Sequence, residues 1–366
     1  MRLILAMLLV GHGLIHLIGV VKAFRLAELP QLTRPIPSAT GLFWLGAACV
    51  FVAAAAALYL WPRWWWLVAA AAVIVSFAAI LPSWADAKWG AAVNVIVLVA
   101  AVFGYLADGP SSLRAAYDRE VAAGLARTRP QPPVTEADLA HLPGPVGRYL
   151  LAAGVLGQPR VRNMRARMRG RIRSGPDAPW MPFTAEQHNF FDEPSRLFYM
   201  DASRLGIPIQ GLHRYAGSSA SMRIKAAALV PVVTASGPEM TQAETVTMFN
   251  DMCLFAPATL IDPSIRWEGE QGMVVRAAFT HAGHTIRANL AFDDTGHLTN
   301  FWSDDRRIVS AGGETRPARW STPIGRYQPF GPVRLGSVGE GRWHEPAGEY
   351  AYIELEITEV QYNVGQ

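Results

Sequence analysis

The stretch Met164-Arg-Ala-Arg-Met-Arg-Gly-Arg-Ile-Arg173 decides how the larger part of this chain is expected to fold. Apolar or small residues alternate with arginine along it, which is typical of a β-strand with one face in a core and the other in water. The apolar face must be covered by other parts of the chain, so the stretch predicts a one-sided sheet.

Several later segments continue this pattern. Asp293-Asp-Thr-Gly296 is a good hairpin turn between two of them. The strand-like segments are Phe183–Phe191, Leu197–Ala202, Met222–Ala228, Met273–Thr280, Thr285–Phe292, Leu298–Asp304 and Tyr350–Val360. They predict a mostly antiparallel sheet, curved in the manner of a half-barrel.

The segment Thr241–Leu260 interrupts the series, because it is rich in Met and Ala and lacks alternation. It predicts a helix on the concave face of the sheet, with Val246, Phe249, Met252 and Cys253 as its apolar side. Methionine adapts to irregular apolar ligands, although it also fills ordinary cores. The candidate ligand-lining residues are Met164, Met168, Ile172, Phe249 and Met252.

The arginine face of the first strand has two interpretations. Arg165, Arg167, Arg169 and Arg171 are candidates to bind anionic lipid headgroups, because guanidinium groups form paired hydrogen bonds with phosphate. Alternatively, this is a solvated face paired with acids on adjoining strands, for which Glu186, Glu354 and Glu356 are the candidates. Only three of the 33 basic residues are lysine. This bias toward arginine is typical of genome composition, so the choice of arginine on this strand does not by itself indicate a function.

The N-terminal third has a different composition. Overall, 51% of residues are hydrophobic and 17% charged, and residues 1–108 carry six of the 33 basic and three of the 29 acidic residues. Four apolar stretches there are long enough to cross a bilayer, with tryptophan at their ends as at membrane interfaces. They are Leu3–Val21, Ala39–Trp61, Trp64–Pro82 and Trp89–Leu106.

These patterns predict an α+β chain in three parts. A four-helix transmembrane domain (1–108) precedes a connector (109–134) and a soluble antiparallel β domain (135–366) with one or two helices on its concave face. The connector contains a helix at Leu113–Arg127 and a stiff spacer, Arg129-Pro-Gln-Pro-Pro133. Positive charges flank the spans equally on both sides, and the long first loop slightly favours a β domain outside the cytoplasm.

Histidines supply the remaining candidate chemistry. His12 and His16 lie on one face of the first span, either as a metal, haem or proton-relay pair or as neutral imidazoles bonded to neighbouring helices. His281, His284 and His297 form a weak surface zinc candidate. We identify no catalytic motif, cofactor or metal site, and the near-neutral β domain argues against nucleic acid.

The whole chain resembles an uncharacterised bacterial family of four-helix membrane proteins with a C-terminal β domain. The β domain is also similar to the half-barrels that carry lipoproteins and lipids across the bacterial periplasm. The family resemblance rests on Gly11-His-Gly-Leu-Ile-His-Leu-Ile-Gly-Val-Val-Lys-Ala-Phe24, Ser83-Trp-Ala-Asp-Ala-Lys88, Leu142-Pro-Gly-Pro-Val146, Trp180-Met-Pro-Phe-Thr-Ala-Glu-Gln187, Tyr215-Ala-Gly217, Gly237-Pro-Glu-Met240, Arg342-Trp343 and Ile357–Tyr362. It implies a multi-pass protein of the bacterial inner membrane.

We therefore expect a membrane-anchored binding protein whose β domain takes a lipid or other hydrophobic ligand near the bilayer. Its expected partners are membrane lipids. Other membrane proteins, bound by the helical bundle, are a further partner class. Two alternatives stay open at this point. One is a membrane-associated enzyme that uses histidines and acids of the β domain, and the other is a scaffold with a filled β core and no catalytic role.

Overall fold

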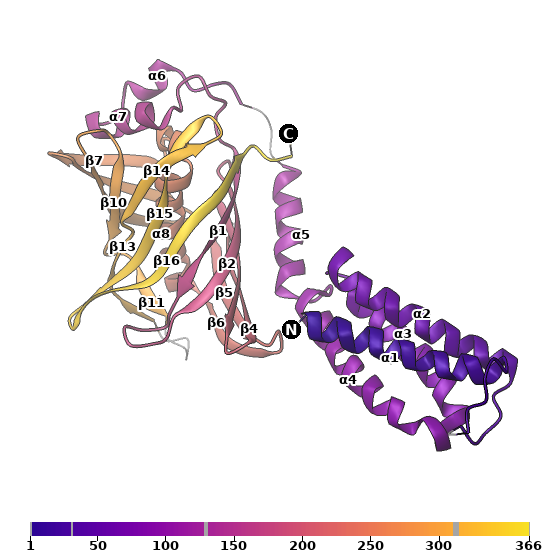
Figure 1. Ribbon diagram of the computed structural model, residues 1–366. Coiled ribbons are helices and arrows are strands. Elements are labelled where there is room, and N and C mark those ends of the chain that lie inside the picture. The colour runs from indigo at the N-terminus through magenta and orange to yellow at the C-terminus, as the bar shows by residue number, and fades with distance from the viewer. Residues whose placement is uncertain (1, 31, 128–130, 310–314, 366) are drawn as a thin grey trace. The chain divides into compact units, whose positions relative to one another are not determined.

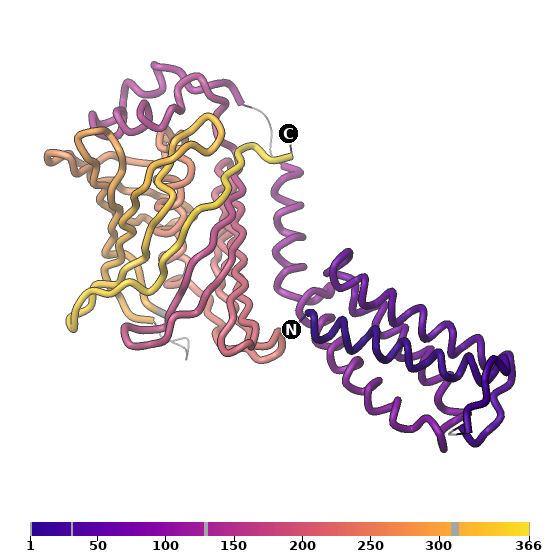
Figure 2. Tube along the Cα trace, in the orientation of Figure 1, coloured from indigo at the N-terminus to yellow at the C-terminus, as the bar shows by residue number. Residues whose placement is uncertain are grey.

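The computed structural model describes residues 2–30, 32–127, 131–309 and 315–365 (Figures 1 and 2). It divides into two compact units, Met1–Ala116 and Tyr117–Gln366. Of the Pro-rich spacer expected at Arg129–Pro133, residues 129 and 130 lie outside the described part. Each unit is considered by itself below.

The first unit is built from helices that pack in chain order, each against the next. Three of its helical stretches are long and apolar enough to cross a membrane, namely Arg2–Ala23, Ser38–Leu60 and a stretch that begins at Trp65 and contains both α3 and α4. Its elements are α1 (Arg2–Ala23), α2 (Ser38–Leu60), α3 (Trp65–Ile80), the short 3-10 turn η1 (Leu81–Ser83) and α4 (Trp84–Asp108).

Small residues allow these helices to approach closely. A Cβ atom added at Gly19 would lie 2.2 Å from the ring of Trp44, and one added at Gly13 would lie 3.0 Å from Phe51. Glycine is therefore required where α1 crosses α2, because a larger side chain would collide with these aromatic residues.

The second unit is an antiparallel sheet that encloses a helix. In the described residues the sheet has fourteen strands in the order β6-β5-β4-β3-β2-β1-β16-β15-β13-β10-β9-β8-β7, and β14 pairs with β15. The strands are β1 (Asn163–Ile172), β2 (Met181–Phe190), β3 (Ser195–Arg204), β4 (Ile207–Ala216), β5 (Ser219–Ala226), β6 (Val230–Ser236), β7 (Ile265–Gln271), β8 (Val274–His281), β9 (His284–Phe292), β10 (Leu298–Ser303), β13 (Arg319–Ser321), β14 (Ile324–Phe330), β15 (Val333–Glu345) and β16 (Gly348–Tyr362).

The enclosed helix is α8 (Pro238–Phe255), followed by the 3-10 helix η2 (Pro257–Ile261). It contacts β4, β5 and β6 from one half of the sheet and β9, β10 and β15 from the other, so the sheet curves around it (Figure 1). The predicted helix and curved antiparallel sheet are thus confirmed. The sequence predicted that only one side of this helix would be covered. In the structure the helix is covered on all sides, because every residue from Ala243 to Phe255 is buried.

Smaller elements complete this unit. Tyr117 on α5 (Leu113–Leu125), within the predicted connector helix, bonds His188 on β2 through its hydroxyl at 2.7 Å. After α6 (Glu136–Leu139), helix α7 (Gly144–Ala153) meets the end of α8, where the Tyr149 hydroxyl donates to the Cys253 carbonyl oxygen at 2.8 Å. A separate pair of strands is formed by β11 (Arg307–Val309) and β12 (Thr315–Pro317).

Candidate functional site

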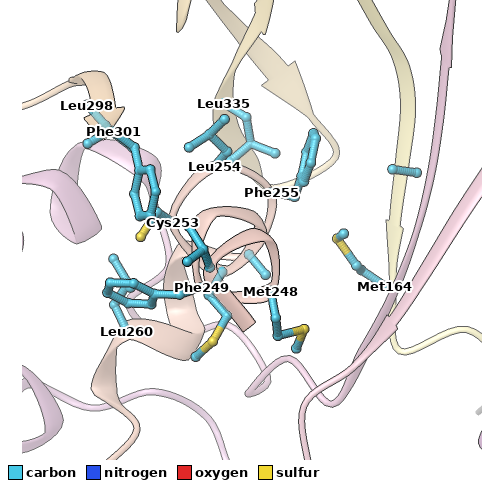
Figure 3. Close-up of a cluster of buried hydrophobic side chains, with 14 of the residues drawn as sticks. Met164, Met248, Phe249, Cys253, Leu254, Phe255, Leu260, Leu298, Phe301 and Leu335 are labelled. Atoms are coloured by element: carbon cyan, nitrogen blue, oxygen red, sulfur yellow. The ribbon is translucent and has the colours of Figure 1, made fainter. Parts of the chain in front are cut away.

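The predicted ligand-lining residues lie between α8 and the concave face of the sheet. Met164, Met168, Phe249 and Met252 are buried in one continuous apolar cluster, and Ile172 packs against it at partial exposure. Figure 3 shows Met164 pointing from its strand toward α8, which carries Met248 and Phe249. Period-two and helical patterning therefore identified residues of this interior correctly, and their role in lining a ligand stays a prediction.

A cluster of charged side chains lies in the same interior, and sequence reasoning did not identify it. Glu244 and Asp251 are two turns apart on α8, and Arg196 reaches both from β3. Its Nε lies 2.7 Å from Asp251 Oδ2, and one terminal nitrogen lies 3.1 Å from Glu244 Oε2. All three residues are almost fully buried. We call these residues, with His213 and Arg306, the charged cluster.

Two amides of β2 complete the environment of Asp251. Gln187 Nε2 and Asn189 Nδ2 donate to the same carboxylate oxygen, Oδ2, at 2.7 and 3.0 Å. Burial raises the pKa of Asp251, and Arg196 opposes this shift. The carboxylate thus accepts three hydrogen bonds in a water-poor site, which is the condition under which a buried charge is tolerated.

Three basic side chains surround Glu244. His213 Nδ1 lies 3.5 Å and an Arg306 terminal nitrogen 3.8 Å from its Oε1, in addition to Arg196 on the other oxygen. Burial by itself raises the pKa of Glu244, but His213, Arg196 and Arg306 outweigh it and hold that pKa well below its usual range. Glu244 is therefore an anion in the folded protein.

Arg306 is the least satisfied member of the charged cluster. Its guanidinium lies 5.0 Å from the ring of Trp320 and 6.0 Å from that of Trp343. The side chain is about nine-tenths buried, and its Nε has no hydrogen-bond partner among the described residues. A guanidinium carries five N–H donors, so Arg306 retains capacity to bind an anionic group.

The arginine face of β1 is paired with acids of β16. Arg165 and Arg167 lie 2.8 and 3.2 Å from Glu359. Arg169 lies 2.8 Å from Glu356, and Arg171 lies 2.7 Å from Glu354. Two of the acids suggested from sequence, Glu354 and Glu356, are thus partners, and Glu359 was missed. Because acids face this ladder, its binding of anionic headgroups stays a prediction.

A cavity of about 520 Å³ opens on another part of the sheet, between β13, β14 and β15. Ser321, His344 and Glu349 are among its lining residues. Ser321 Oγ lies 2.8 Å from His344 Nε2, and His344 Nδ1 lies 3.2 Å from Glu349 Oε2. A hydroxyl next to an imidazole that faces a carboxylate is the arrangement of an activated nucleophile. Nothing local in the sequence indicated it, since strand register alone joins these positions.

The two histidines of α1 share a hydrogen-bond network with Ser76 and Asn94. His16 Nδ1 donates to the His12 carbonyl oxygen at 2.8 Å, so its Nε2 accepts from Ser76 Oγ at 2.7 Å. Asn94 Nδ2 donates to Ser76 Oγ at 2.9 Å, and its Oδ1 lies 3.0 Å from His12 Nε2. This pattern suits two neutral imidazoles bonded to neighbouring helices, one of the two interpretations of the pair.

The remaining histidines are dispersed. His281 and His284 face each other across the β8–β9 turn, and His297 stacks on Tyr327 with 4.0 Å between ring centroids. In the described ranges, no group of three or more His, Cys, Asp or Glu side chains is placed to hold a metal ion.

Comparison with known proteins gives one family. The family described as "Family of unknown function (DUF6544)" matches residues 132–355, more than half of the chain. None of the curated proteins compared with the chain matches it.

Three solved structures show remote similarity. An outer membrane lipoprotein-sorting protein domain from Vibrio parahaemolyticus is 9% identical with a TM-score of 0.32, covering 56% of this chain and 86% of its own. A DUF1329 family protein from Desulfovibrio piger is 13% identical with a TM-score of 0.35, covering 64% and 95%. A LolA superfamily protein from Nitrosomonas europaea is 10% identical with a TM-score of 0.31, covering 55% and 86%. At these scores the similarities support no conclusion about this chain.

Proposed function

This chain belongs to the family of unknown function DUF6544, and we propose that it is a membrane-anchored protein whose β domain holds a lipid or other hydrophobic ligand. The ligand would lie between α8 and the concave face of the sheet. The anchor would be the helices of residues 1–108, in the bacterial inner membrane, with the β domain outside the cytoplasm. The connector would be 109–134 and the β domain 135–366.

The observation that carries the proposal is the composition of the interior around α8. Methionines line both sides of the contact between helix and sheet, and they are buried. They are Met164, Met168, Met200, Met222, Met240, Met248 and Met252. Flexible thioether chains can rearrange around an acyl chain or a polyisoprenoid without leaving rigid voids, so this interface is suited to open along α8.

The charged cluster supplies a polar end for the same ligand. Arg306 combines a buried guanidinium, an unbonded Nε and two tryptophan rings. A phosphate or carboxylate would satisfy these donors with paired hydrogen bonds. The favoured ligand is therefore an amphiphile with an anionic end at Arg306 and an apolar part along the methionines.

Mass spectrometry of lipids retained by the full chain after delipidating washes tests this proposal. We expect Met168→Trp, which fills the interior, to reduce the retained lipid severalfold. Thr184→Trp is the matched control, because Thr184 adjoins Ala185, the cross-strand partner of Met168, and is exposed on the opposite face of the sheet; it should retain lipid as the parent does. Equal retention by both variants would contradict the proposal and favour a scaffold with a filled core.

The cavity at Ser321 supports a second candidate function, hydrolysis of an ester. Ser321 Oγ would attack the acyl carbon while His344 Nε2 takes its proton and then passes it to the leaving alcohol, and water would release the acyl group. Glu349 would orient the imidazole, although it also bonds Arg342. Labelling of the chain by a fluorophosphonate, lost in Ser321→Ala, would support this candidate. Absence of labelling in the parent chain would contradict it.

A further inference from the structure

Five large apolar side chains are exposed at one end of strands β4, β5 and β6. We call them the apolar tip. Their exposed fractions are 96% for Leu205, 50% for Ile207, 59% for Leu229, 55% for Val230 and 44% for Val232. Contiguous exposed apolar residues on a folded domain mark an interaction surface rather than ordinary surface composition.

Strand register brings two turns together at this tip. The β3–β4 turn is closed by the pair Arg204 and Ile207, and the β4–β5 register pairs Ile209 with Ala226 at the start of the β5–β6 turn. The backbone N–H of Ala227 donates to the carbonyl oxygen of Pro208 at 2.7 Å. The two turns therefore form one surface.

Leu205 occupies a backbone conformation that does not suit leucine. Its φ is +52°, and the φ of the following Gly206 is +80°. Two-residue hairpin turns with both φ values positive favour Asn-Gly, because a β-carbon is crowded in the left-handed region. Leucine thus adds strain to this turn without burying its side chain in the domain.

The charge close to the tip is mainly positive, and Asp201 on β3 is the acid nearest to it in the sequence. No Asp or Glu occurs between residues 203 and 238, whereas Arg204, Arg223 and Lys225 lie within the hairpins that form the tip. Apolar side chains flanked by an excess of cations are the composition of protein surfaces that insert into the headgroup region of anionic bilayers.

We propose that the apolar tip docks on the bilayer, with Leu205, Ile207 and Leu229 in the headgroup and acyl boundary and the three cations on anionic lipid phosphates. This inference rests on the membrane anchoring of the proposed function. It adds a second attachment, which would hold the end of the curved sheet at the lipid surface from which a hydrophobic ligand would enter.

Site-directed spin labelling of the full chain in phosphatidylcholine vesicles, with and without phosphatidylglycerol, tests the docking. Labels are placed singly at Leu205, at Leu14 and at Ser218, after Cys49→Ala and Cys253→Ala remove the native thiols. Ser218 is the matched control, because it is an exposed turn residue at the opposite end of β4 and β5. Leu14 is an exposed apolar residue of α1 and reports the anchor.

We expect the labels at Leu14 and Leu205 to collide severalfold more often with oxygen than with a water-soluble nickel complex, and the label at Ser218 to show the reverse. Phosphatidylglycerol should increase the contrast at Leu205. Lipid contact at Leu14 with water contact at Leu205 would overturn the docking and leave the anchor intact. Water contact at Leu14 would overturn the anchor and, with it, the docking.

Shielding of the Leu205 label from both collision reagents would also overturn the proposal, because it would indicate a second copy or another protein on the tip. Leu205→Asn provides a variant that should fold, since asparagine suits this turn better than leucine. With a reporter at Leu229, it should lower lipid contact severalfold while the thermal unfolding midpoint of the chain stays the same or rises. Unchanged lipid contact at Leu229 would contradict the role of Leu205.

Discussion

The arginine ladder on β1 and the single Arg196 on β3 place the same side chain in opposite environments. The ladder pairs with β16 acids on an outer face, where the Arg169 side chain is 66% exposed. Arg196 lies inside the curved sheet and bonds two buried carboxylates on α8. The alternation along β1 makes the ladder conspicuous in the sequence. From the burial of its partners, however, we expect removal of Arg196 to lower the free energy of unfolding more than removal of a ladder arginine.

Solvation explains the contrast. An exposed ion pair exchanges water for a partner of similar strength, so its net contribution to stability is about 0–1 kcal/mol. A buried pair has already lost its water, so removal of one partner leaves a charge that nothing stabilises. Breaking such a cluster is therefore costly, although an apolar replacement of all its members together can be neutral for stability.

The largest expected effect is that of Arg196→Met. It leaves Glu244 and Asp251 buried without their main cation, so we expect the free energy of unfolding of the β domain to fall by about 3–5 kcal/mol. Hydrogen exchange of β2 and β3 peptides in the full chain measures this change without interference from the helical unit. A loss below about 1 kcal/mol would show that Arg196 is solvated like the ladder.

Glu244→Gln should have a smaller and pH-dependent effect. The amide keeps the shape but leaves Arg196, Arg306 and His213 without their shared anion, so we expect a loss of about 2 kcal/mol at neutral pH. The lowered pKa of Glu244 means that its stabilisation is complete above the unfolded-state pKa of about 4.3 and is lost as the pH falls below that value toward the lowered pKa.

The difference between the parent chain and Glu244→Gln should therefore be constant from neutral pH to about pH 5 and shrink below about pH 4. Unfolding midpoints of both proteins across this range provide the measurement. A difference that grows on acidification would contradict the sign of the pKa shift.

Arg169→Met should have the smallest effect. Because Arg169 and Glu356 are both partly exposed, we expect a loss below about 1 kcal/mol at low salt and a smaller one in about 1 M salt, where screening acts within about 3 Å. The same hydrogen-exchange measurement applies. A loss as large as that of Arg196→Met would remove the contrast between the two arginine sites.

Patterns of period two and helical spacing predicted the inner face of the β domain well. Met164 and Met168 on β1 and Phe249 and Met252 on α8 are buried as expected, because burial of alternate residues is a local property of a strand. The strands at the sheet edges and late in the chain were harder to predict from sequence. The Gly- and Pro-rich segment around β14 and β15 lacks alternation, although its residues pair in the sheet.

The charged cluster could not be predicted in the same way. Arg196 follows the turn before β3 and resembles any exposed charge at a strand end, while its partners are on a helix far along the chain. One signal was present: Glu244 and Asp251 are seven residues apart, on one face of a helix expected to be covered by the sheet. Their partners depend on the curvature of the sheet, which no local pattern contains.

Photo-crosslinking tests the central claim, a hydrophobic ligand beside α8, most directly. A diazirine analogue of methionine is incorporated into the full chain in native membranes, irradiated, and mapped by peptide mass spectrometry. The account predicts lipid adducts at Met7, which is exposed on α1, and also at Met164, Met168 or Met252. Adducts at Met7 with none at the three interior methionines would contradict it and show that the interior is filled by the protein alone.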